Sequence, residues 1–294
     1  MKLRIGTRRS HLALAQAGEV AERLARVGAE SEIVPMATSG DRGADVGTSP
    51  AGVKGLFVAE IVRALQAGEV DLAVHSAKDL PAADEEGVAV AAVPPRADPS
   101  DILVTREPTL HEGATVGTSS LRRRAQLLSL RPELSLVEIR GNVDRRLRKL
   151  EDGEVDGMVL AAAGIARLGT TVAYADVLPI VPAPGQGCLA VQVRADDQAT
   201  MEAVAWLDDP QSRMAFEAER SVMARLGGGC ALPLGALATV TGDTVRLVAL
   251  VASPDGSRIV RVESESPTPE GAADVASREL LARGASDILA HVRS

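Results

Sequence analysis

The sequence of 294 residues predicts an α/β protein with two lobes, followed by a smaller α+β domain. Strand-like and helix-like segments alternate through its first two-thirds, which is typical of sheets flanked by helices. Two proline-rich segments, residues 93–99 and 181–187, interrupt this alternation and are interpreted as crossings between the lobes. Two crossings between two α/β units indicate a bilobal clamp with a cleft between its lobes.

The first unit begins with a short strand and a helix whose apolar residues recur at helical spacing after an N-cap at Ser10. Residues 38–54 are rich in glycine, serine and aspartate and lack periodicity. Because they are long for a connection, they are either mobile or functional, and a lid over the cleft is one hypothesis. The predicted strands of this unit cover residues 3–6, 31–36 and 70–75, and its helices cover residues 10–27 and 55–67.

The second unit lies between the crossings, and the pattern changes again after Pro210. Alternation in both units predicts parallel sheets, in which ligands bind at the carboxyl ends of strands and at helix N-termini. The second unit has predicted strands over 114–117, 134–139 and 157–160 and helices over 119–130 and 143–151. The last domain has predicted helices over 211–226 and 269–292 and strands over 234–240, 244–252 and 258–265. The expected domains are residues 1–95 with about 188–207, residues 96–187, and residues 208–294.

Composition restricts the classes of function. A hydrophobic share of 46% and a charged share of 24% are typical of a folded soluble protein, and no window reaches the apolar length of a membrane span. Aromatic residues make up only 1%, which argues against a protein that stacks nucleic-acid bases. The sequence has no signal-peptide pattern, no CxxC motif and no paired His/Cys spacing. We therefore expect a cytoplasmic protein without disulfide, metal, membrane or nucleic-acid partner. A monomer is expected because nothing in the sequence demands a partner chain.

Positive charge is concentrated in one segment of an acidic protein. The net charge is −8, yet between Arg122 and Lys149 nine basic residues are opposed by three acidic ones, a local balance of +6. Most of these cations are arginines, whose planar guanidinium matches the two oxygens of a carboxylate or phosphate. The segment therefore indicates an anion site, while the acidic net charge argues against nucleic acid as the anion.

Three strand-to-helix junctions combine backbone N–H groups with hydroxyls and arginines. In residues 116–124, capping would explain Ser119 but not the run of arginines, so an anion cradle is favoured over an N-capped helix with a solvated basic face. Cations around the helix start that follows Arg140 oppose the helix dipole unless an anion is bound. Arg8 and Ser10 repeat this pattern, and the three junctions predict a cleft for a ligand with several acidic groups.

Residues 75–81 follow a predicted strand and place Lys78 and Asp79 near its carboxyl end. Asp79 is the only carboxylate of this segment, and beside so many cations it should stay ionised. Such a carboxylate can stabilise a developing cation or pass a proton to a leaving amine. The alternative is an aspartate that starts a turn before Pro81, and His75 is interpreted as structural.

Cys230 follows three glycines and precedes Pro233, so it is expected on a loop. A thiol on a glycine-rich loop can be a nucleophile, a metal ligand or a covalent anchor. The alternative is an inert small residue at a turn.

In their order and spacing these motifs resemble those of the hydroxymethylbilane synthase, or porphobilinogen deaminase, family from Leu3 to about Ala290. The segments that carry the resemblance are residues 7–10, 54–58, 75–81, 116–123, 140–143, 186 and 228–230. The resemblance implies two periplasmic-binding-protein-like α/β lobes around a cleft and a third domain with a three-stranded sheet and a cofactor-bearing cysteine. It also implies a transferase that adds porphobilinogen units to a dipyrromethane cofactor, held through a thioether. Ammonia would leave at each step, and a linear tetrapyrrole, hydroxymethylbilane, would be hydrolysed off at the end.

Carried over by motif, the resemblance gives each candidate residue a role. Cys230 is the attachment site of the cofactor, a tether rather than a turnover nucleophile, and Asp79 is the catalytic carboxylate. The residues implied in holding acetate and propionate side chains are Arg8, Lys78, Arg122, Arg123, Arg140, Arg146 and Arg167, with Ser10, Ser76, Thr118 and Ser120 as auxiliary donors. The implied supporting residues are Gln16, Asp41, Lys54 and Gln186.

Two positions depart from the family pattern. Ala59 stands where many relatives have a lysine, so a contribution from that lysine is not carried over. Cys188 stands where relatives commonly have a small residue such as alanine; we interpret it as a packed, unreactive thiol, with a second oxidisable site as the alternative. A non-catalytic, two-lobed anion-binding protein is the competing class of function, and the cysteine-bearing third domain argues against it.

Overall fold

The computed structural model describes residues 2–36, 50–228 and 232–293, and for residues 50–57 and 293 it describes the backbone alone. Asp41, Cys230 and residues 38–49 of the expected loop lie outside the described residues, as does the side chain of Lys54.

The first lobe is built on a five-stranded sheet with the strand order β2-β1-β3-β10-β4. β1 pairs in parallel with β2 and β3, but β10 is antiparallel to both β3 and β4, so the expectation of a parallel sheet is wrong here. The exception arises because β10 returns from the second crossing instead of following a crossover helix. The strands are β1 (Lys2–Arg8), β2 (Glu30–Met36), β3 (Leu72–Ser76), β4 (Val88–Ala92) and β10 (Leu189–Arg194).

Helices cover both faces of this sheet. α1 (His11–Arg26) packs Ala17, Val20 and Leu24 against one face, together with residues of α6 (Gln198–Val204). α2 (Pro50–Gln66) packs against the other face. The sequence predicted that this helix begins at residue 55, but it begins at Pro50. The predicted cap of α1 is confirmed, since the backbone N–H of Ala13 donates to Ser10 Oγ at 3.3 Å.

The second lobe repeats this plan with the strand order β7-β6-β8-β5-β9. β6 is parallel to β7 and β8, whereas β5 is antiparallel to β8 and β9, so this sheet is mixed as well. Its strands are β5 (Asp101–Thr105), β6 (Thr115–Gly117), β7 (Ser135–Val137), β8 (Gly157–Ala161) and β9 (Tyr174–Val177). Its helices are α3 (Leu121–Leu130), α4 (Val143–Glu151) and α5 (Ala162–Leu168).

The third domain is an antiparallel three-stranded sheet, β11-β12-β13, packed against helices. The predicted final helical stretch is divided at Gly284, whose φ of +90° is readily adopted only by glycine. The strands are β11 (Leu234–Thr241), β12 (Thr244–Ala252) and β13 (Ile259–Ser266), and the helices are α7 (Pro210–Arg225), α8 (Pro269–Ala282) and α9 (Ala285–Arg293). Two α/β lobes and a smaller α+β domain confirm the predicted fold class.

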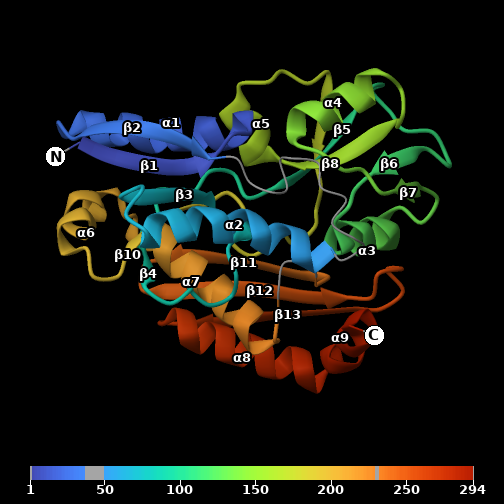
Figure 1. Ribbon diagram of the computed structural model, residues 1–294. Coiled ribbons are helices and arrows are strands. Elements are labelled where there is room, and N and C mark those ends of the chain that lie inside the picture. The colour runs from blue at the N-terminus through green and yellow to red at the C-terminus, as the bar shows by residue number, and fades with distance from the viewer. Residues whose placement is uncertain (1, 37–49, 229–231, 294) are drawn as a thin grey trace.

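The third domain lies beneath both lobes in the view of Figure 1, and the two crossings meet at its helix α7. Glu219 of α7 is fully buried at this meeting point, and its carboxylate accepts hydrogen bonds from three segments, namely the two crossings and β11. Arg96 of the first crossing donates from Nη1 at 2.6 Å, the backbone N–H of Gly185 in the second crossing at 2.6 Å, and that of Ala238 in β11 at 2.7 Å. One carboxylate therefore ties both crossings to the third domain.

Candidate active site between the lobes

A pocket opens between the two lobes, beside the ends of β3 and β8. Sheets of this kind bind ligands at the carboxyl ends of their strands. The polar lining residues are Gln16, Ser76 and Lys78 from the first lobe and Arg123, Arg146 and Arg167 from the second. The apolar lining residues include Leu12, Val143, Leu160, Ala161 and Ala163. The pocket thus combines four cationic side chains with apolar walls.

The first lobe contributes the turn that follows β3. Lys78 and Asp79 lie in a short 3-10 helix, η2 (Ala77–Asp79), and Gln16 Nε2 donates to Ser76 Oγ at 2.7 Å. Gly185 of the second crossing passes against this turn with a φ of +72°, and a Cβ there would stand 3.1 Å from backbone atoms of Ala77 and Lys78. Glycine therefore allows the crossing to pack beside the proposed catalytic segment.

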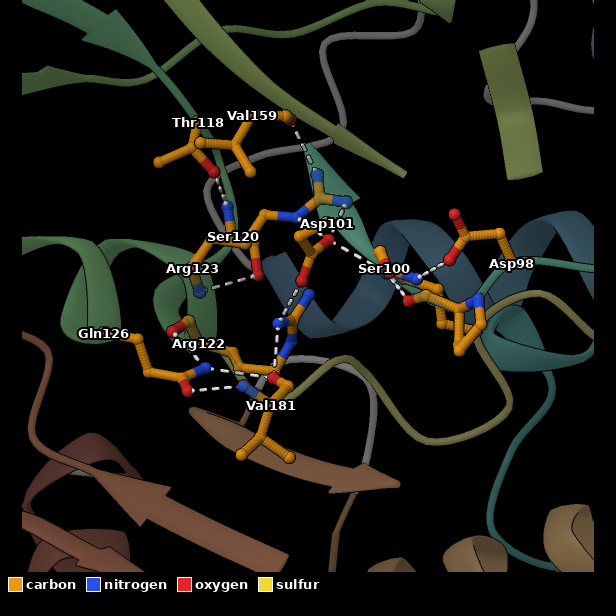
Figure 2. Close-up of polar contacts among 12 residues, drawn as sticks. Asp98, Ser100, Asp101, Thr118, Ser120, Arg122, Arg123, Gln126, Val159 and Val181 are labelled. Carbon is orange, nitrogen blue, oxygen red and sulfur yellow. Dashed lines mark hydrogen bonds and ion pairs between the residues drawn. The ribbon is translucent and has the colours of Figure 1, made fainter. Parts of the chain in front are cut away.

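In the second lobe, Asp101 at the start of β5 holds the arginines at the start of α3, as Figure 2 shows. Arg122 Nη1 donates to Asp101 Oδ2 at 2.6 Å, and Arg123 Nε donates to Asp101 Oδ1 at 2.8 Å. Their remaining donors are partly used by carbonyls: Arg122 Nη1 reaches Val181 O at 2.7 Å and Arg123 Nη1 reaches Val159 O at 2.8 Å. The cluster fixes Arg123 at the pocket wall.

The charge of this cluster is balanced inside the lobe. Burial alone would raise the pKa of Asp101, but the charges of Arg123 and Arg122 outweigh it and hold that pKa well below its usual range. Gln186 Nε2 adds a hydrogen bond to Asp101 Oδ1 at 2.9 Å. Asp101 is therefore an ionised, fully buried carboxylate that compensates two buried cations.

The pKa of Arg146 on α4 is shifted by charged residues of both lobes. Burial lowers the pKa of its guanidinium, the nearby charge of Arg123 lowers it further, and the carboxylate of Asp79 raises it. Its Nε donates to the carbonyl of Gly141 at 2.7 Å. Asp79 therefore lies close enough to Arg146 for the two charges to interact between the lobes.

Several predicted binding residues lie away from the pocket lining. Arg122 is buried on Asp101, whereas Arg140 is 65% exposed and pairs with Glu138 at 2.7 Å. Ser10 caps α1, Thr118 Oγ1 accepts from the Ser120 backbone N–H at 3.2 Å, and Gln186 is buried against Asp101. Arg8 lies near His75, where its charge helps to lower the pKa of that imidazole. Contacts between these seven residues and a ligand stay predictions.

Two residues of the site carry little reactivity of their own. Cys188 is 1% exposed, and burial raises the pKa of its thiol to about 12, which agrees with a packed, unreactive side chain. His75 is buried as well, and burial lowers the pKa of its imidazole to about 4, so it is neutral near pH 7. Both are better suited to packing than to acid–base or nucleophilic chemistry.

Sequence reasoning missed Asp101, Glu219 and Glu19. Each pairs with an arginine far away in the chain, and no local motif marks the carboxylate. It also placed the cap of α3 one residue early: Ser120 Oγ, not that of Ser119, accepts from the Arg123 backbone N–H at 3.4 Å. Ser119 precedes the cap position because the helix begins at Leu121.

Within the described ranges, no helix is long and apolar enough to cross a membrane. Across the same residues, no three side chains of His, Cys, Asp and Glu gather as a metal site would require.

Fold and site together define a class: a two-lobed α/β protein with a pocket lined by cationic side chains between its lobes and an attached α+β domain. Residues 3–202 match the family model described as "Porphobilinogen deaminase, dipyromethane cofactor binding domain", and residues 214–281 match "Porphobilinogen deaminase, C-terminal domain". The chain belongs to the porphobilinogen deaminase family, a family of transferases, as its motifs predicted.

Individual relatives extend the match to nearly the whole chain. A porphobilinogen deaminase of Syntrophotalea carbinolica is 46% identical over 299 residues, covering 98% of this chain and 95% of its own. One of Brevibacillus brevis is 42% identical over 301 residues, covering 99% and 97%. Among solved structures, a periplasmic substrate-binding protein of an ABC transporter from Coxiella burnetii is 18% identical with a TM-score of 0.42, covering 72% of this chain and 94% of that one.

Proposed function

We propose that this chain joins porphobilinogen units head to tail on a dipyrromethane cofactor that is bound to Cys230 through a thioether. Ammonia leaves at each addition, and hydroxymethylbilane is hydrolysed off at the end. The observation that carries this proposal is the pocket itself, in which four cations line apolar walls beside the turn that bears Asp79.

The donor set fits the cofactor and the substrate. Both consist of pyrrole rings with acetate and propionate side chains, so they combine flat apolar surface with several carboxylates. Arg123, Arg146, Arg167 and Lys78 offer N–H donors to carboxylates, while Leu12 and other apolar residues offer surface to the rings. Cations facing bound carboxylates also explain why basic side chains gather around helix starts in this chain.

Each group of this chain then has a task. When bound, the cofactor supplies the pyrrole carbon to which the next unit is joined. Asp79, placed between the lobes by η2, stabilises positive charge that develops on the substrate as the amine departs, and it accepts hydrogen bonds from pyrrole N–H groups. Arg123 and Arg146 hold side-chain carboxylates so that the reacting carbon stays near Asp79.

We further propose a division of labour along the chain. Residues 1–95 with about 188–207 form the lobe that bears Asp79, residues 96–187 form the arginine-rich lobe, and residues 208–294 form the domain that anchors the cofactor. Cys230 lies outside the described residues. Five residues further on, Gly235 packs against the second crossing, where a Cβ would stand 2.9 Å from Val181 O, so the start of β11 lies against the crossing. We expect a cytoplasmic monomer.

The anchor is tested by intact-mass measurement of protein made in a porphyrin-producing host. We expect a mass excess equal to two linked pyrrole units, mapped to the peptide that contains Cys230. Cys230→Ser should lack this excess, and Cys188→Ala, which changes the other cysteine, should retain it. A bare mass in the active wild-type protein would contradict the proposal.

Asp79 is tested by turnover of porphobilinogen. Asp79→Asn should fold and carry the cofactor but lose about a hundredfold or more in kcat, because an amide cannot stabilise the developing cation as a carboxylate does. Asp84→Asn is the matched control, since Asp84 lies nearby and pairs with Arg220 at the surface. Turnover near the wild-type value in Asp79→Asn would remove this carboxylate from the mechanism.

A further inference from the structure

Arg167, a lining residue on α5, is held by two groups that do not belong to its own lobe's sheet. Its Nε donates to Glu19 Oε2 on α1 at 2.9 Å, and its Nη2 donates to the carbonyl of Gly187 in the second crossing at 3.1 Å. The arginine side chain is 9% exposed, so these contacts are made in a largely dehydrated setting. No motif of the sequence singles out Glu19.

The two contacts leave one end of the guanidinium available. An arginine has five N–H donors, and here Nε and one Nη2 hydrogen are taken. Nη1 forms no hydrogen bond with any residue that the structure describes, although Arg167 lines the pocket. A ligand carboxylate can therefore pair with the Nη1–Nη2 end without displacing either protein contact.

Glu19 is itself fixed. Its second oxygen, Oε1, accepts from Arg23 Nη2 at 3.1 Å, one helical turn along α1. The carboxylate is thus shared between two arginines and meets Arg167 through a single oxygen. It does not occupy the bidentate face of the guanidinium that a competing ligand would take.

We propose that Glu19 is a positioning residue for Arg167: it orients the guanidinium so that the Nη1–Nη2 end receives a carboxylate of a pyrrole side chain. The inference rests on the proposed function. Because Glu19 and Arg167 come from different lobes, this carboxylate subsite is complete only while α1 and α5 are in contact. The carboxylate can come from the cofactor or from incoming porphobilinogen, and the experiment separates these sources.

The test compares Glu19→Ala with Glu22→Ala, a matched control on the same helix whose carboxylate is exposed. For each variant, kcat and KM for porphobilinogen, the cofactor-loaded fraction by intact mass, and the melting temperature are measured. Glu19→Ala removes the charge-assisted hydrogen bond that orients Arg167. If the bound carboxylate belongs to the substrate, KM should rise about tenfold while kcat stays within about twofold of the wild-type value. A lower loaded fraction identifies the cofactor as the source. Glu22→Ala should change neither the KM for porphobilinogen nor the cofactor-loaded fraction.

Two further variants separate positioning from general stability. Glu19→Gln keeps an acceptor for Arg167 Nε and should recover part of the loss in KM or loaded fraction, even where its melting temperature equals that of Glu19→Ala. In an Arg167→Gln background, Glu19→Ala should add nothing, because its effect passes through Arg167.

Three results would overturn the inference. These are a KM and loaded fraction unchanged in Glu19→Ala, a KM that falls because Glu19 competes with the ligand, or an equal effect of Glu19→Ala in the Arg167→Gln background. Wild-type protein that fails to consume porphobilinogen would instead contradict the proposed function, so the two failures are distinguishable.

Discussion

Replacing Asp101 with asparagine should destabilise the protein more than any other single neutralisation around the pocket. The carboxylate is fully buried and compensates Arg122 and Arg123, whose side chains are 4% and 9% exposed. Removing one partner of a buried ion pair costs about 3–5 kcal/mol, because the remaining charge stays buried without compensation. The asparagine oxygen can still accept one hydrogen bond, so we expect about 3 kcal/mol, a fall in melting temperature of roughly 6–12 °C.

The assay is thermal unfolding followed by circular dichroism at pH 7, with Asp196→Asn, an exposed aspartate, as the control. The folded-state pKa of Asp101 lies below its ordinary value of 3.8, so its stabilisation is complete above about pH 4 and is lost as the pH falls further. The difference between wild type and Asp101→Asn should therefore shrink below pH 4. Equal melting temperatures for Asp101→Asn and Asp196→Asn at pH 7 would refute the reasoning.

Three further predictions follow from buried groups. Glu219→Gln should lower the free energy of unfolding by about 3 kcal/mol, because Arg96 stays charged and buried. The control Glu217→Gln on the same helix should change the free energy of unfolding little, and similar losses in both variants would contradict the prediction. In a Cys230→Ser background at pH 8, iodoacetamide should modify Cys188 only on unfolding, since its pKa is raised to about 12; rapid alkylation of the native protein would show otherwise. His75, with a pKa lowered to about 4 in the folded state, should make stability fall as the pH drops from about 6.5 to 4, and NMR titration of its imidazole above pH 6 would disprove it.

Local signals made much of the fold predictable. Helix α1 and its Ser10 cap, the strand before Ser76 and the three-stranded sheet of the last domain each follow from spacing and turn residues over short stretches. Strand direction did not follow, because β10 pairs with β3 more than a hundred residues earlier and only the return of the chain decides its orientation. Pattern within a segment carries no information about such a partner.

The same limit applies to the site. A run of arginines at 122–124 indicates an anion, but the sequence cannot say whether that anion is a ligand or a residue of the protein. The structure divides the run: Arg122 is taken by Asp101 and the Val181 carbonyl, while Arg123 also reaches the pocket. Glu19 was missed for a related reason, since a carboxylate on a surface helix looks solvated until its partner in the other lobe is known.

The insertion of β10 between β3 and β4 has a consequence for the order in which the protein can be assembled during synthesis. β4 pairs with no other described strand, so Val88–Ala92 lack a sheet partner until Leu189–Arg194 leave the ribosome. At 5–20 residues per second, the intervening stretch takes roughly 5–20 s to make. All strands of the second sheet, from Asp101 to Val177, are made within this stretch and can pair before β10 appears. During that interval the edge of β3 is an unpaired template for other chains. The lobe that bears Asp79 is thus the last of the two to close, although it is the first to be synthesised.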